Sequence, residues 1–169
     1  NEFNSNAYFR AQDGTMYIGG VNGFNLFQPE NVQPNLVAPP VAVTKFEVFN
    51  EALPMDLSGH EPIQLSYKQD FISFEFTAFD FQSPQKNQYA YKLEGFDEDW
   101  IQAGNRRFAT YTNLPGGQYV FRVKASNSDG IWNETGVAIP VFITPPVWQT
   151  WWFLSSLIVL AGALVAGGF

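Results

Sequence analysis

The chain has 169 residues, with 9 Lys and Arg against 16 Asp and Glu, and therefore a formal net charge of −7. It has no Cys and a single His, His60, which excludes disulfides, thiolate zinc sites, cysteine nucleophiles and paired-histidine metal sites. The negative charge, with Lys and Arg scattered singly, argues against a nucleic-acid binder. The 17 Phe, 7 Tyr and 5 Trp predict a compact β-rich core, and no residue set indicates a cofactor or catalysis, so we expect a non-enzymatic segment.

Residues 1–36 predict a small meander. The pairs Asp13-Gly14 and Asn22-Gly23 are typical of tight hairpin turns. They separate short expected strands at 7–11, 16–20 and 24–28. Three strands of about five residues are too few to bury their own aromatic side chains, so we expect this unit to stack on neighbours of its own kind.

A proline-rich linker, 37–40, precedes a long segment, 41–145, in which apolar and polar residues alternate. Alternation with a period of two indicates half-buried strands. The expected strands are 41–49, 62–67, 72–78, 88–94, 106–112, 118–125 and 137–143. Their number and spacing, without helical periodicity, predict an all-β protein with an immunoglobulin-like antiparallel β-sandwich.

The run from Leu114 to Tyr119 predicts a tyrosine corner, in which the Tyr119 hydroxyl bonds to the backbone a few residues upstream. The alternative is that Tyr119 is simply another core tyrosine.

All 25 charged residues lie at or before Glu134, and the chain is uncharged from Trp151 to Phe169. As a helix this run would rise roughly 28 Å, which matches the hydrocarbon core of a bilayer. Trp148, Trp151 and Trp152 gather at its N-terminal end, where indole rings favour the headgroup level. We therefore predict a truncated transmembrane helix at 148–169 in a fragment of a longer protein; the alternative is a buried core helix.

Four runs of residues, 89–97, 99–100, 111–119 and 127–133, together resemble the triple-tyrosine, or Y_Y_Y, domain. The motif positions that carry the resemblance are Tyr89, Tyr91, Gly95, Trp100, Tyr111, Leu114, Pro115, Gly117, Tyr119, Asn127, Gly130 and Trp132. Residues 13–20 and 22–27 similarly resemble the end of a two-component-regulator propeller blade.

The resemblance implies a fibronectin type III-like sandwich in a bacterial two-component sensor, between a periplasmic β-propeller and a transmembrane helix. It implies that residues 1–147 lie on the periplasmic side of the inner membrane. The upstream propeller would detect a ligand, and the sandwich would form a homodimer and relay the change to a cytoplasmic histidine kinase or diguanylate cyclase. Pro145 and Pro146 form a short, stiff coupling linker, since proline restricts φ.

Other interpretations stay open. The segment could be a membrane-anchored carbohydrate-binding module that uses exposed aromatics such as Trp100 or Trp132; a row of exposed rings along a groove would support this, and burial of the rings would weaken it. The acidic run from Asp97 to Asp99 lacks the spacing of a calcium loop, so we expect a solvated turn. The cations Lys92, Arg122 and Lys124 could line a sheet face that contacts a partner subunit or only solvent.

Overall fold

The computed structural model of the chain describes the backbone of residues 3–54 and 56–167. The chain divides into two compact units between Leu36 and Val37, and each is described here by itself. The outermost residues of the predicted meander and of the predicted membrane helix, 1–2 and 168–169, lie outside the described residues.

The first unit is an antiparallel sheet with the strand order β1-β2-β3. The elements are β1 (Phe3–Arg10), β2 (Met16–Gly20), β3 (Gly23–Phe27) and the short 3-10 helix η1 (Pro29–Asn31). Gly14 and Gly23 have φ of 87° and 125°, which explains glycine at both turns. β1 begins earlier than predicted, and its pairing is irregular between Phe3 and Tyr8.

The meander leaves its large apolar side chains in solvent. Tyr8, Phe9, Phe24 and Leu26 are each more than 60% exposed. This agrees with the expectation that three short strands cannot bury their own apolar residues. The resemblance of this unit to a propeller blade stays a prediction.

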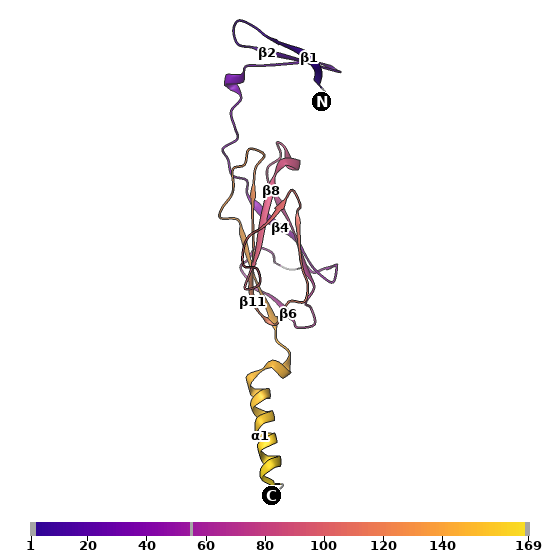
Figure 1. Cartoon of the computed structure of the whole chain (residues 1–169), viewed down its shortest axis with the longest axis vertical. Coiled ribbons are helices and arrows are strands. Elements are labelled where there is room, and N and C mark those ends of the chain that lie inside the picture. Colours follow the sequence, from indigo (N-terminus) through magenta and orange to yellow (C-terminus); the bar gives the residue numbers. More distant parts are fainter. Residues whose placement is uncertain (1–2, 55, 168–169) are drawn as a thin grey trace. The chain divides into compact units, whose positions relative to one another are not determined.

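The second unit is a sandwich of a four-stranded sheet, β10-β7-β4-β5, and a five-stranded sheet, β6-β12-β11-β8-β9 (Figure 1). The bounds are β4 (Val41–Val48), β5 (Glu51–Ala52), β6 (Ile63–Ser66), β7 (Ile72–Ala78), β8 (Gln88–Glu94), β9 (Ile101–Gly104), β10 (Phe108–Tyr111), β11 (Gly117–Ser126) and β12 (Val137–Thr144). A 3-10 turn, η2 (Pro84–Lys86), precedes β8. The predicted all-β sandwich is confirmed.

Three details of the sandwich differ from the prediction. β5 and β9 were not expected; β5, with two residues, is too short to show alternation. In addition, β6 pairs with β12 in parallel, whereas the other paired strands of the sandwich are antiparallel. The parallel pair matters below, because it sends two chain segments out of the sheet in the same direction.

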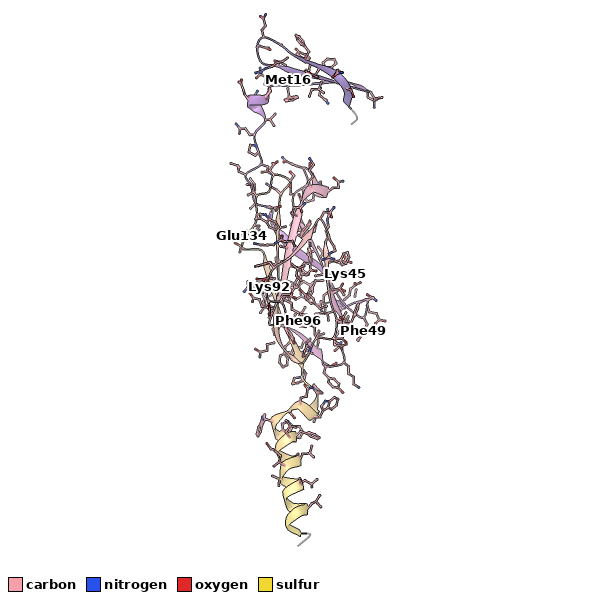
Figure 2. All side chains as sticks on the ribbon, in the orientation of Figure 1. Met16, Lys45, Phe49, Lys92, Phe96 and Glu134 are labelled. Atoms are coloured by element: carbon pink, nitrogen blue, oxygen red, sulfur yellow. The ribbon has the colours of Figure 1, made fainter. Side chains whose placement is uncertain are left out.

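Stacked aromatic rings join the two sheets. Phe74 of β7 lies parallel to Phe121 of β11, with ring centroids 3.9 Å apart and an interplanar angle of 2°. Both side chains are fully buried, and burying one phenylalanine stabilises the fold by about 2–3 kcal/mol. Figure 2 shows Lys45 of the four-stranded sheet on one side of the sandwich and Lys92 of the five-stranded sheet on the other.

The C-terminal helix starts later than predicted. Val147–Gln149 form a 3-10 turn, η3, and α1 covers Trp151–Gly167. Thr150 between them is extended, with ψ of 143°, and its carbonyl accepts the bond from the Leu154 amide at 3.1 Å that opens the helix. Trp148 therefore lies in the turn, not on the helix. In the described part of the chain, no helix combines the length and the apolar character needed to cross a membrane.

Candidate functional site

The tyrosines of the predicted motif form part of the sandwich core. Tyr89 and Tyr91 of β8, Tyr111 of β10 and Tyr119 of β11 are all at most 7% exposed. Strand alternation turns these positions inward, and each hydroxyl finds a hydrogen-bond partner, as a buried polar tip requires. The Tyr89 hydroxyl accepts a bond from the Ala78 amide (3.1 Å), and the Tyr91 hydroxyl accepts one from the guanidinium of Arg106 (2.9 Å).

Tyr111 anchors the turn between β8 and β9. Its hydroxyl donates to Asp97 Oδ2 at 2.6 Å, and the same oxygen accepts the Leu93 amide at 2.7 Å. Burial, and secondly this bond to Asp97, raises the pKa of the Tyr111 hydroxyl far above its ordinary value. The turn is therefore held by the hydrogen bond from the Tyr111 phenol, which gives the Asp97 side chain a structural task. Within the described residues, no three acidic or histidine side chains are grouped so that they could hold a metal ion.

Tyr119 makes the predicted corner. Its hydroxyl donates to the carbonyl of Pro115 at 2.9 Å, across the turn that joins β10 to β11. Two glycines leave room for the ring: a Cβ on Gly95 would meet the Tyr119 ring at 3.1 Å, and one on Gly117 would meet its hydroxyl at 3.3 Å. Leu114 in the same turn is buried. The tyrosine corner, rather than a plain core tyrosine, is confirmed.

The loop between β11 and β12 holds the linker that enters the sandwich. Asn127, which is 1% exposed, donates from Nδ2 to the Val37 carbonyl at 3.0 Å, and its Oδ1 accepts the amides of Asp129 and Ile131. Asn133 donates to the Pro39 carbonyl at 2.9 Å. The linker residues 37–39 are thus tied to the sandwich by two amide side chains. The motif residue Gly130 serves the turn of this loop, with φ of 83°.

The linker that leaves the sandwich is held by packing. Pro145 is half-buried and Pro146 is buried. A Cβ on Gly116 would lie 2.5 Å from Pro145 Cα, so the two backbones touch. Beyond the prolines, the ring of Trp148 meets Tyr67 edge-on, with centroids 5.2 Å apart.

Comparison with known proteins fits this geometry. Residues 80–144 match the Y_Y_Y domain. The chain contains a Y_Y_Y domain. It is 32% identical, over 98% of its length, to a protein named histidine kinase P4 from Formosa agariphila.

Two crystal structures from B. thetaiotaomicron are also similar over 86% of this chain. One is the extracellular domain assigned to a hybrid two-component system, with 27% identity and a TM-score of 0.69; the other is assigned to a one-component system, with 25% identity and a TM-score of 0.57. The chain spans only 13% of the histidine kinase and about a fifth of each crystallised chain.

The two motif tryptophans of the Y_Y_Y domain flank a lysine on the outer face of the five-stranded sheet. Lys124 Nζ lies 4.8 Å from the ring centroid of Trp100 and 5.4 Å from that of Trp132, and it pairs with Glu134 at 2.7 Å. Trp100 is 37% exposed and Trp132 is half-buried. The rings thus form neither a buried pair nor an exposed row, and the lysine occupies the space between them.

The other two cations predicted on this face are also engaged within the domain. Arg122 pairs with Glu94 at 2.6 Å, and Lys92 donates to the Glu98 carbonyl at 2.6 Å. These contacts favour a solvated face whose charges stabilise the sheet locally.

Sequence reasoning missed three of the residues that hold the linkers. Asn133 and Tyr67 act across long sequence separations, so no local pattern marks them. Gly116 could have been found from the sequence, because the turn carries two adjacent glycines. Only Gly117 is needed beside the Tyr119 hydroxyl, so the second glycine indicates another close contact.

Proposed function

We propose that this chain is an extracellular, non-catalytic part of a two-component sensor, in which the Y_Y_Y domain relays a ligand-induced change from an upstream propeller to a membrane helix and a cytoplasmic output domain. The observation that carries the proposal is that the domain holds both of the linkers that flank it, the entry linker and the exit linker. Val37 and Pro39 are bonded at one side, and Pro145 and Pro146 are packed at the other. A domain with loose linkers would lose a change of orientation instead of passing it on.

The relay requires two protomers. A single helix has no evident second state for a distant ligand to select, whereas the relation between two helices does. We therefore propose a homodimer that pairs through the sandwich. The pairing is modest in strength, because a switch needs two arrangements of similar free energy.

We further propose that α1 is the described part of a segment that anchors the sensor in the inner membrane, with residues 1–147 in the periplasm. Support comes from the uncharged sequence of α1 and from the exposed Trp151 and Trp152 at its start. Carbonate extraction of cell membranes tests this. The chain should stay in the pellet, and a truncation at residue 145 should move to the supernatant; release of the whole chain would contradict the anchor.

Glycine substitution of the exit linker tests the relay. In the sensor that carries this chain, Pro145→Gly with Pro146→Gly should abolish induction, so that induced and basal output become equal. The reason is that glycine frees the φ angles that proline restricts. The affinity for the inducer should stay within about twofold, since the inducer binds outside this domain. Normal induction by the double variant would contradict the relay.

Cysteine cross-linking tests the homodimer, and this chain, which contains no Cys, can be expressed in membranes with a single introduced label. A cysteine at exposed Gln149 should form a disulfide between protomers in membranes, and one at Gly130, far along the sandwich from the exit linker, serves as the comparison. A strictly monomeric sensor with normal output would remove the dimer from the proposal.

A saccharide-binding role has one observation in its favour. A groove of about 520 Å³ crosses the outer face of the five-stranded sheet and carries the Phe142 ring with the amides of Gln64 and Gln118. Its volume lies in the range of small-molecule sites. Titration of the chain with neutral oligosaccharides, followed by the NMR chemical shifts of these amides, separates the two functions. Localised, saturable shifts would favour saccharide binding. Unchanged spectra would exclude binding of these saccharides and leave the relay as the proposed function.

A further inference from the structure

The parallel pair β6–β12 places two segments side by side where they leave the sheet. Thr144, the last residue of β12, pairs with Ser66, the last residue of β6. Since parallel strands run in the same direction, the residues after Ser66 and after Thr144 emerge at the same end of the sheet. This register brings Tyr67 next to the exit linker.

The β10–β11 turn contacts the exit linker at Pro145. Gly116 meets Pro145 so closely that a Cβ would lie 2.5 Å from Pro145 Cα and 2.9 Å from its nitrogen. These are backbone atoms, so an added methyl group would have to displace the chain itself. The β10–β11 turn is itself held by the hydrogen bond from the Tyr119 hydroxyl to the Pro115 carbonyl at 2.9 Å.

The two turns are tied to each other and carry the linker between them. The Leu114 amide donates to the Asp70 carbonyl at 3.3 Å, which joins the β10–β11 turn to the turn after β6. Trp148 packs edge-on against Tyr67. The amides of Gln149 and Thr150 close the 3-10 turn through bonds to the carbonyls of Pro146 and Val147, at 2.9 and 3.1 Å.

We infer that Gly116 and Tyr67 are positioning residues that hold the exit linker in one orientation on the Y_Y_Y domain. We call these two residues, with the contacts just described, the linker seat. Gly116 acts by having no side chain, which lets Pro145 lie against the turn, and Tyr67 acts through its ring against Trp148. The role of the seat in signalling rests on the proposed relay, but the seat itself is a structural property that can be measured without any signal.

Distance measurements between spin labels test the seat directly. In the chain reconstituted in lipid nanodiscs, cysteines replace exposed Gln64 on β6 and exposed Gln149 in the linker, and the chain has no other Cys to interfere. The seat predicts a single narrow distance distribution. Gly116→Ala and Tyr67→Ala should each broaden this distribution at least twofold or shift its maximum. In the chain without labels, each substitution should speed amide exchange of Gln149 and Thr150 by about tenfold or more, because the 3-10 turn then opens locally.

Two matched variants separate positioning from general stability. Tyr67→Phe keeps the ring and should restore the narrow distribution. Gly130→Ala adds a methyl group to a glycine at φ of 83° with open space around it, in the β11–β12 loop at the entry linker and away from the exit linker. It should lower the melting temperature of the domain and leave the distance distribution and the linker exchange unchanged.

The outcomes are distinct. Unchanged distances and exchange in both Gly116→Ala and Tyr67→Ala overturn the seat, and Tyr67→Ala decides alone if Gly116→Ala does not fold. A loosened linker in the variants supports it. If the seat is confirmed while the double glycine variant of the sensor signals normally, the relay is wrong and the seat stands.

Discussion

The two ends of the Y_Y_Y domain hold their linkers by different interactions. At the entry end, two asparagine side chains donate hydrogen bonds to the carbonyls of Val37 and Pro39. At the exit end, the backbone of Gly116 packs directly on Pro145, and Tyr67 packs on Trp148.

This difference has a mechanical consequence. A hydrogen bond to a carbonyl contributes about 1 kcal/mol net, because water can replace the protein donor when the bond opens. A contact between two backbones has no such substitute, since steric repulsion rises steeply over a few tenths of an ångström. The entry linker is therefore held by bonds of modest individual strength, whereas at the exit end Gly116 and Pro145 are in direct backbone contact. In the proposed relay both linkers stay attached to the domain, and this backbone contact would pass a displacement of the turn on to Pro145.

The largest effect is expected at the entry end, from Asn127→Ala. This buried amide makes one bond to Val37 and accepts two backbone amides, so its loss leaves several polar groups unpaired and should destabilise the domain by about 2–4 kcal/mol. Asn133→Ala, at a half-buried position with fewer bonds, should cost only about 1–2 kcal/mol. Urea unfolding of the chain gives both values, and equal small losses would mean that the entry linker is held by something else.

Alkaline pH should lower the stability of the whole domain through Tyr111. Tyr111, which ends β10 just before the turn that holds Pro145, has a raised pKa because of burial and its bond to Asp97. Below pH 10 the phenol is protonated in both the folded and the unfolded chain, so its contribution is fully present. Above pH 10 the unfolded chain loses this proton and the folded domain keeps it, so stability falls by about 1.4 kcal/mol per pH unit from this residue.

The control is Tyr111→Phe, which removes the ionisable group. Its unfolding free energy should fall less steeply between pH 10 and 11 than that of the wild type. Asparagine does not titrate, so Asn133→Ala should keep the wild-type slope. A wild-type slope in Tyr111→Phe would contradict the assignment.

The architecture of the sandwich was predictable because half-buried strands leave a period-two pattern in the sequence. That pattern marked β7, β8 and β11 at nearly their observed bounds, and the tyrosine corner followed from the residues of one turn. The C-terminal helix was placed three residues early, because Trp148 is as apolar as the helix, and the 3-10 turn and extended Thr150 that separate the two leave no apolar or polar signal in the sequence.

The linker contacts were not predictable for a different reason. They join residues up to 94 positions apart, as Asn133 and Pro39 show, and such pairs depend on strand order and register. The parallel pairing of β6 with β12 illustrates this, since no local pattern distinguishes a parallel edge strand from an antiparallel one.

A smaller effect is expected from Tyr119→Phe at the exit end. The variant loses one hydrogen bond to the Pro115 carbonyl and keeps the ring, so the domain should lose about 1 kcal/mol. Tyr8→Phe, at a tyrosine that is 69% exposed in the meander, is the matched control and should be neutral. Thermal unfolding compares them; a neutral Tyr119→Phe would show that packing around the ring, not the corner bond, fixes the turn.

The smallest effect is expected from Glu134→Gln, and it separates two explanations for the order of the entry loop. Glu134 follows Asn133 directly and pairs with Lys124, so the loop could be held either by this surface ion pair or by the buried amide bonds. The Glu134 side chain is 70% exposed, and exposed pairs contribute only about 0.2–1 kcal/mol, less at high salt. Glu134→Gln should therefore change the unfolding free energy by less than about 0.5 kcal/mol at 0.5 M NaCl, with amide exchange of residues 37–40 as in the wild type. Lys124→Met keeps the apolar stem between Trp100 and Trp132 but removes the cation, and should cost about 0.5–1 kcal/mol through the lost cation–π contacts, with a change in tryptophan fluorescence. If Glu134→Gln instead freed residues 37–40, surface charge rather than the two asparagines would hold the entry linker, and the contrast between a hydrogen-bonded entry and a packed exit would have to be redrawn.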